Sequence, residues 1–162
     1  MEQATTSAPV SSDAQAAAPA TRVSLSRVGV TGVEKVIRVG HDGDGTEGGG
    51  GLYHASLEAF VDLNPEQAGV HMSRFEEVVN EAIDRVVLGE SLRAEELAAH
   101  IAERVRERQG GIRAEVRISA RYPETVPAPV SGIPTQELYT LFGTAVASER
   151  GTRTLRGVEA QG

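Results

Sequence analysis

Two segments of the chain alternate between apolar and polar residues, a pattern typical of a β-strand with one buried face. Between residues 53 and 63, one face carries Tyr53, Ala55, Leu57, Ala59, Val61 and Leu63, while Phe60 is an apolar exception on the other. Between residues 112 and 122, one face carries Ile112, Ala114, Val116, Ile118, Ala120 and Tyr122. The second segment is the clearer, because arginine, glutamate and serine fill its opposite face. Two half-buried strands are predicted.

Between these strands the apolar period changes to that of amphipathic helices. The first helix is predicted from the stripe Phe75, Val78, Val79, Ala82, Ile83, Val86 and Val87. Ser73 and Glu76 match a capping box at its start, and Gly89 is expected to end it. Ser91 is expected to cap a second helix that ends at Gly110. Its apolar side carries Leu97, Ala98, Ile101 and Val105.

Two outer strands complete the expected set. The segment Val23–Val39 is rich in β-branched residues, and its two glycines indicate a bulge or bend. The segment Glu137–Ser148 fits a helix or a strand by pattern, and its β-branched and aromatic content favours a strand. A glycine loop over 40–51 and a proline loop over 123–134 would connect the strands. A last extended piece is expected near Thr154–Val158.

The predicted order is strand, strand, helix, helix, strand, strand. This order favours an α+β fold: a four-stranded antiparallel sheet with both helices on one face. The other face would meet solvent or another subunit, and it carries His54, Ser56, Glu58, Arg113, Glu115 and Arg117. Because such a unit leaves a sheet edge and a face uncovered, we expect a homo-oligomer.

Composition divides the chain into a tail and a folded module. Residues 1–21 are almost all Ala, Ser, Thr, Pro and Gln, so we expect a disordered tail there and the module over 22–162. The net charge of −7 argues against a general nucleic-acid or membrane-surface binder. The chain has no cysteine, no apolar run long enough for a membrane span and no secretory signal pattern. A cytoplasmic location is expected.

The segment Gly69–Glu77, GVHMSRFEE, is the main candidate for a binding site. A helix N-terminus presents free N–H groups, to which Arg74 would add a bidentate donor and His71 a titratable one. His71, Ser73 and Arg74 could therefore bind part of a phosphate chain. The alternative is purely structural: Ser73 caps the helix while His71 and Arg74 are solvated.

The remaining histidines and arginines are weaker candidates. His41 lies in the glycine loop, and His100 is expected on the surface of the second helix. His54 and Glu58 share a strand face but lie roughly 13 Å apart along it, too far for one metal ion. The stripe formed by Arg113, Arg117 and Arg121 could meet phosphate, although cross-strand pairing with Glu58 or Asp62 is the commoner outcome.

Several blocks in order resemble a known enzyme family. They are VSLSRVGVTGVEK, FVDLNPEQAGVHMSRFEEVV, RAEVRISARY and PAPVSG, and the similarity extends from about Asp13 to Gly162. They resemble the N-terminal half of GTP cyclohydrolases of the type IV/type IB group, the first two blocks being closest to the archaeal methanopterin-pathway type. The resemblance implies a tunnelling-fold unit, a fold that assembles into barrels with active sites at subunit borders.

The resemblance also implies a reaction. An iron(II) or related divalent ion activates water for attack at C8 of GTP, formate leaves, and a 7,8-dihydroneopterin phosphate forms for pterin or folate biosynthesis. The product is a 2′,3′-cyclic phosphate in the archaeal branch and a triphosphate in the bacterial branch.

One departure from the family concerns the metal. A segment like RGVEAQG leads, in the family, into a CPC motif that supplies a metal-site cysteine, and this chain ends at Gly162 before such a motif. No metal ligand is therefore assigned to this chain, and we expect it to be inactive without a complementary C-terminal module. The alternative is a catalytically incomplete tunnelling-fold unit that assembles with itself or binds a purine or pterin.

Overall fold

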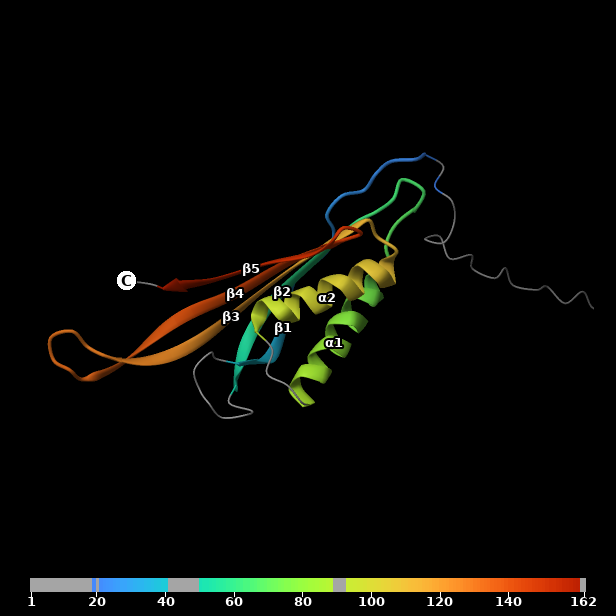
Figure 1. The fold of residues 1–162 in the computed structure, drawn as a ribbon. Coiled ribbons are helices and arrows are strands. Elements are labelled where there is room, and N and C mark those ends of the chain that lie inside the picture. Colours follow the sequence, from blue (N-terminus) through green and yellow to red (C-terminus); the bar gives the residue numbers. More distant parts are fainter. Residues whose placement is uncertain (1–18, 20, 41–49, 89–92, 161–162) are drawn as a thin grey trace, which may run out of the picture.

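The computed structural model describes residues 19, 21–40, 50–88 and 93–160, and it contains five strands and two helices in those ranges (Figure 1). The strands are β1 (Val28–Gly40), β2 (Gly50–Asp62), β3 (Arg113–Pro127), β4 (Pro134–Ser148) and β5 (Gly151–Ala160). The helices are α1 (Met72–Leu88) and α2 (Ala94–Gln109). The predicted tail over 1–21 falls almost wholly outside the described residues and stays a prediction.

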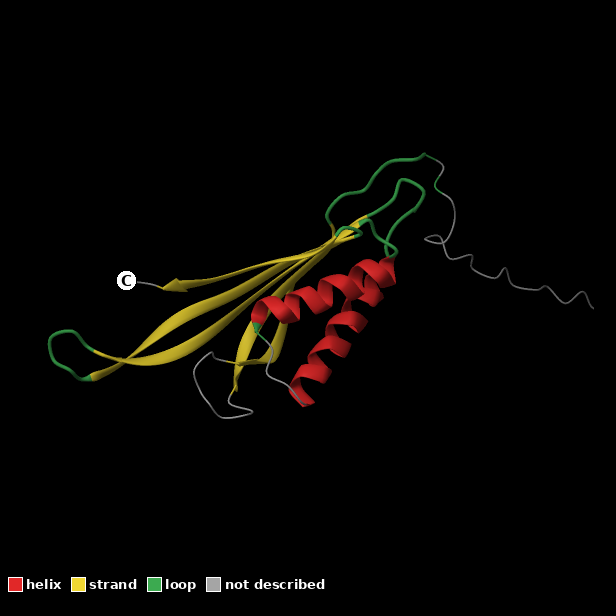
Figure 2. Ribbon diagram, viewed as in Figure 1, coloured by secondary structure: helices red, strands yellow, loops and turns green. Residues whose placement is uncertain are grey.

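The strands form one antiparallel sheet in chain order, β1-β2-β3-β4-β5. The helices are inserted between β2 and β3, which nevertheless pair directly, from His54 opposite Arg121 to Asp62 opposite Arg113. Both helices lie on the same face of the sheet (Figure 2). The predicted α+β class is confirmed, and the arrangement is that expected of a tunnelling-fold unit.

The sheet has five strands, so the prediction of four is wrong. Residues Gly151–Ala160, of which only Thr154–Val158 was expected to be extended, form the full edge strand β5. Most of its side chains are exposed, including Leu155 and Val158. An edge strand with few buried positions lacks the apolar alternation that marks a strand in sequence.

Two strand boundaries also differ from expectation. β1 begins at Val28 rather than Val23, although the predicted irregularity is present as a register shift between Val30 and Val33. The proline loop is shorter than 123–134, because β3 continues to Pro127, which pairs with Pro134. Pairing of β3 with β2 stops at Arg121. Beyond that point β3 has a free edge, where a proline needs no ladder partner.

The core lies between the helices and the centre of the sheet. The predicted strand faces are buried at their centres, with Leu57, Ile118 and Val116 at most 1% exposed, whereas Ile112 lies before β3 and is exposed, contrary to the prediction. The described part of the predicted α1 stripe is buried too: Phe75, Val78, Val79, Ala82 and Ile83. On α2 the buried set includes Leu97, Ala98, Ile101 and Val105, as predicted. The apolar periods thus correctly predict which faces of the two helices and of the sheet pack against each other.

The helix starts differ from those predicted. α1 begins at Met72, so Ser73 lies inside its first turn and the predicted capping box is wrong. α2 begins at Ala94 with Arg93 as N-cap, and the Glu96 carboxylate accepts a hydrogen bond from the Arg93 N–H at 3.1 Å. Gly89 and Ser91 lie outside the described residues. Gly110 ends α2 in the left-handed conformation, as predicted.

The β3–β4 hairpin extends past the end of the helices (Figure 1). Tyrosines cover its helix-side face there: Tyr122 lies edge-on to Tyr53 at 5.9 Å between ring centroids and stacks on Tyr139 at 5.6 Å. Each hairpin tyrosine donates to a glutamate two residues away on its own strand. Burial is the largest cause that raises the pKa of Tyr122. The hydrogen bond to Glu137 is the largest cause that raises the pKa of Tyr139. Both phenols therefore stay neutral and continue the apolar layer beyond the core.

No helix in the described ranges is long and apolar enough to cross a lipid bilayer.

Gly143 sets how closely α2 approaches the sheet. A Cβ atom at this position of β4 would lie 2.4 Å from the carbonyl carbon of Ala94 and from the amide nitrogen of Glu95. Both atoms belong to backbone at the start of α2, which cannot move without displacing the helix. The first turn of α2 therefore packs directly on the β4 backbone.

We expect Gly143→Val to lower the free energy of unfolding by about 1–3 kcal/mol, because the added side chain forces α2 away from β4. Chemical denaturation of the parent and variant chains measures this difference. Thr144→Val is the matched control, since Thr144 is the next residue of β4 and lies on the opposite face. Equal stability of the Gly143→Val variant and the parent would show that α2 does not contact β4 there.

Candidate functional site

The start of α1 and the end of α2 meet at one end of the molecule, where the side-chain amide of Gln109 joins them. Gln109 is the last residue of α2 and is only 4% exposed. Its Oε1 accepts a hydrogen bond from the His71 N–H at 3.2 Å, and its Nε2 donates to the His71 carbonyl at 2.9 Å. One buried amide thus fixes both polar backbone groups of the residue that precedes α1.

The loop that leads into α1 is tied to the same point. Gln67 donates from Nε2 to the Gln109 carbonyl at 2.9 Å. Its Oε1 accepts a hydrogen bond from the Asn64 N–H at 3.2 Å, and its own N–H donates to the Asn64 carbonyl at 2.9 Å. The turn after β2 is therefore hydrogen-bonded to the C-terminal end of α2, which holds residues 64–71 in place.

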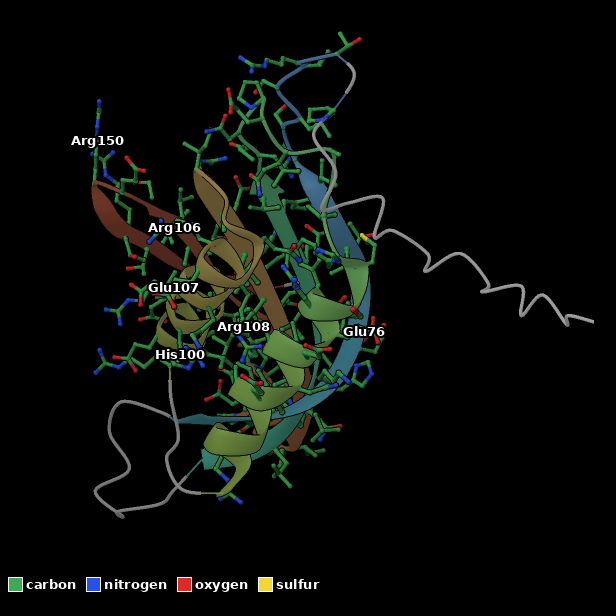
Figure 3. The ribbon with its side chains drawn as sticks, turned by 90° about the vertical axis from the view of Figure 1, so that its right-hand side faces the viewer. Glu76, His100, Arg106, Glu107, Arg108 and Arg150 are labelled. Atoms are coloured by element: carbon green, nitrogen blue, oxygen red, sulfur yellow. The ribbon has the colours of Figure 1, made fainter. Side chains whose placement is uncertain are left out.

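Arg74 also reaches from α1 to the end of α2. Its Nη1 donates to the Arg108 carbonyl at 3.0 Å, one of the last carbonyls of α2, which lack partners within the helix. Arg108 in turn donates to the Glu81 carboxylate of α1 at 3.0 and 3.1 Å. Figure 3 shows Arg108 on the side of α2 that faces α1, and Glu76, His100 and Glu107 elsewhere on the helix surfaces. The helix pair is thus joined by reciprocal arginine contacts.

The structure places the three predicted site residues together at the start of α1. Ser73 is exposed in the first turn, and the side chains of His71 and Arg74 are partly buried. Arg74 uses one of its five donor hydrogens on α2, and the other four can serve a further acceptor. Gln109 fixes the backbone position of His71. A residue whose side chain binds a ligand needs a backbone that is held in this way.

Gln109 was not among the predicted site residues, although its position in the helix indicates a buried amide. Leu97, Ile101 and Val105 follow one another at intervals of four, and the next position in that series is Gln109. A glutamine at an apolar position of a helix needs a buried hydrogen-bond partner. The pattern could identify Gln109 as a buried amide, whereas its partner, the His71 backbone, depends on how the helices fold back on each other.

The uncovered face of the sheet carries a second polar cluster, formed by Arg27, Asp62, Arg113 and Glu115. The Arg27 guanidinium lies 4.3 Å from the centre of the Phe60 ring and donates to Glu115 at 2.9 Å. Arg113 donates to Glu115 at 2.7 Å and to Asp62 at 3.4 Å. The pairing predicted between Arg113 and Asp62 is confirmed.

These ion pairs shift the pKa of Glu115. The hydrogen bond from Arg27 lowers it most, partial burial opposes this, and the hydrogen bond from Arg113 lowers it further. The net direction is below the ordinary value of 4.5. Glu115 therefore stays ionised at neutral pH and balances the two arginines beside it.

Within the described ranges, no group of three or more His, Asp or Glu side chains lies close enough to hold a metal ion. His54 contacts Glu34 at 3.2 Å across β1 and β2. His41 lies outside the described residues. The described donor set thus does not fit a divalent metal ion.

We expect Gln109→Leu to lower the free energy of unfolding by about 1–3 kcal/mol, because it removes the acceptor of the His71 N–H and one of the two donors to the His71 carbonyl, the other being the Arg74 N–H. Thermal or chemical unfolding measures the loss. Gln136→Leu, at an exposed position of β4, is the control and should leave stability near the parent value. If both variants behave alike, the Gln109 amide does not hold the start of α1.

Glu115 predicts a pH dependence of stability. The pKa of Glu115 is lower in the folded chain than in the unfolded chain. Its contribution to the free energy of unfolding is therefore fully present at pH values above the unfolded-state pKa, and it is lost as the pH falls through the folded-state pKa. Glu115→Gln should therefore destabilise the chain at neutral pH and converge on the parent in acid. Unfolding from neutral to acid pH tests this, with Glu159→Gln on β5 as control. A Glu115→Gln deficit that is the same at every pH would contradict the assignment.

The sequence profile of one family, described as "Type I GTP cyclohydrolase folE2", matches residues 12–162. The chain is also similar to proteins named "GTP cyclohydrolase MptA". Identity is 34% over 151 residues with the protein of Haloferax volcanii and 36% over 152 residues with that of Haloarcula marismortui. Each alignment covers 93% of this chain and 48% of the relative.

A more distant relative with the same name, from Methanothermobacter thermautotrophicus, is 32% identical over 135 residues, which are 83% of this chain and 41% of that protein. The chain therefore spans about half the length of the relatives that it matches. The family match covers the sheet, both helices and the junction at His71. The chain belongs to the type I GTP cyclohydrolase family of the folE2 kind.

Proposed function

We propose that this chain supplies the N-terminal tunnelling-fold module of a GTP cyclohydrolase. The reaction opens the imidazole ring of GTP at C8, releases formate and yields a 7,8-dihydroneopterin phosphate. The observation that carries this proposal is the family match over residues 12–162, which includes every described strand and helix. The uncovered sheet face supports it, because such a face is available to line a shared interior.

In this proposal the start of α1 binds part of the GTP phosphate chain. Ser73 is exposed in the first turn, where backbone N–H groups and the helix dipole favour an anion. Arg74 offers its remaining guanidinium hydrogens, and His71 offers a ring nitrogen. The Gln109 amide and the Arg74–Arg108 contact support the proposal by fixing the backbone from which these groups project.

The divalent metal, iron(II) or a related ion, would be held by groups other than the described side chains of this chain. The metal would supply a water molecule of lowered pKa for the attack on the purine. Since the described residues offer no cluster of three ligands, no step of the reaction is assigned to a metal on this chain. The described residues are left with substrate binding and orientation.

In this proposal the active site is complete only when the chain pairs with another module or with further copies of itself. β1 and β5 are the edges of the sheet, and each presents backbone groups that a further strand can pair with. A complementary C-terminal module or further copies of the chain would pair with these edges. The alternative function is a tunnelling-fold unit that assembles or binds a purine or pterin without catalysis, which the same uncovered edges would allow.

The direct test combines this chain with a C-terminal module of the family that carries the cysteine motif, adds iron(II), and measures formate released from GTP. We expect formate from the mixture only, and none from either part alone. Absence of formate from a mixture that forms a stable complex and retains metal would contradict catalysis and favour the alternative.

His71→Asn should lower formate release by about tenfold or more, because it removes the imidazole nitrogen proposed to bind the phosphate chain while leaving the backbone contacts to Gln109 intact. His100→Asn is the matched control, since His100 lies on α2 away from the junction (Figure 3). Steady-state formate release by the complete mixture measures both. Equal loss in the two variants would remove His71 from the proposed site.

A further inference from the structure

A groove on the uncovered sheet face lies at the end where β4 turns into β5. Its volume is about 360 Å³, and it is lined by Arg113, Val146, Ser148, Arg150, Gly151, Thr152 and Arg153. Arg113 comes from β3, Arg153 from β5 and Arg150 from the turn between β4 and β5. Three arginines from separate segments thus converge on one groove, with no acidic residue in its lining.

The register brings these arginines to the same face. Arg113 lies opposite Ser148, and Arg153 lies opposite Val146 two residues away on β4. The Cα atoms of Arg113 and Arg153 are therefore about 12 Å apart, from two strand spacings combined with an offset of two residues along the strand. Long guanidinium side chains that start this far apart can both reach one anion between them.

The turn that carries Arg150 is held by Ser148. The Ser148 hydroxyl donates to the Gly151 carbonyl at 3.2 Å and accepts a hydrogen bond from the Arg150 N–H at 3.3 Å. Gly151 has φ +113°, a conformation that residues with a Cβ rarely adopt. Figure 3 shows Arg150 at the end of this hairpin, clear of both helices. Arg150 is exposed at this turn and is one of the residues that line the groove.

The positive charge of the groove is not balanced in full. Arg113 is paired with Asp62 and Glu115, as described above. Arg150 and Arg153 have no ion pair within residues 19, 21–40, 50–88 and 93–160. The acidic group nearest in sequence is Glu149, an exposed neighbour of Arg150 in the turn. Two guanidinium groups are left to face an incoming anion.

We propose that this groove binds the phosphate groups of a small molecule, through Arg150 and Arg153 with Arg113 at its inner side. The planar fork of each guanidinium matches two oxygens of a phosphate, and two forks can hold adjacent phosphate groups. A nucleic acid does not fit, because the chain as a whole carries a net charge of −7. The groove lies on the opposite sheet face from His71, and its phosphate binding does not require GTP ring opening.

The test titrates the 162-residue chain with inorganic tripolyphosphate, GTP and guanosine by calorimetry, at low and at high sodium chloride. Tripolyphosphate and GTP should bind, guanosine should not, and added salt should weaken both interactions. Arg150→Ala and Arg153→Ala should each weaken tripolyphosphate binding by about tenfold, the loss expected for one charged hydrogen-bonded contact. If GTP binds and tripolyphosphate does not, the phosphate site is wrong.

Arg121→Ala is the matched control, because Arg121 is an exposed arginine of the same sheet face, outside the groove. It should bind tripolyphosphate as the parent chain does. A loss as large as that of Arg153→Ala would mean a diffuse charge effect and would overturn the proposal.

A second measurement separates this groove from the start of α1. The double variant Arg150→Ala, Arg153→Ala should remove the groove's share of tripolyphosphate binding, and the binding that remains then belongs to another part of the chain. If the double variant binds tripolyphosphate as the parent chain does, the groove proposal fails.

Discussion

The hydrogen bonds between the Gln109 amide and the His71 backbone join the elements on which the rest of the structure depends. They connect the last residue of α2 to the residue before α1, and Gln67 ties the turn after β2 to the same point. Because Gln109 is almost fully buried, breaking this contact leaves its amide and the His71 N–H without the partners that they have in the fold. The relative position of the helices and the backbone at His71 are therefore fixed together.

The helix pair covers only one face of the sheet, and this asymmetry determines what the other face can do (Figure 2). The covered face is closed by direct backbone approach at Gly143 and by the apolar stripes of both helices. The uncovered face carries alternating charges around Glu115, and at the end of the β4–β5 hairpin it carries Arg150 and Arg153, which form no ion pair with another described residue. The covered face thus stabilises the fold, and the uncovered face carries the groove to which we assign phosphate binding.

The apolar periods predicted most of the fold, because an element that is buried on one face has apolar residues at regular intervals in its sequence. The strand faces around Leu57 and Ile118 and the helix stripe at Phe75 and Val78 lie where the pattern placed them. Most of β5 was not predicted, because an exposed edge strand lacks this regular pattern of apolar residues. The capping box at Ser73 failed because the α1 start is fixed by a distant residue, Gln109, rather than by its own side chains.

The candidate site could be predicted only as a segment. GVHMSRFEE identified where chemistry-bearing residues gather, but the contact of Arg74 with Arg108 depends on the return of α2 to the start of α1. The groove at Arg150 and Arg153 left no motif in the sequence, since its residues come from three segments that only the strand register aligns.

Amide hydrogen exchange at His71, measured residue by residue by nuclear magnetic resonance, tests the central contact most directly. The His71 N–H is bonded to a buried oxygen and should exchange slowly, whereas the Ser73 N–H, in the first turn of α1, should exchange much faster. Comparable fast exchange at both positions would contradict the account, because the start of α1 would then not be fixed by α2.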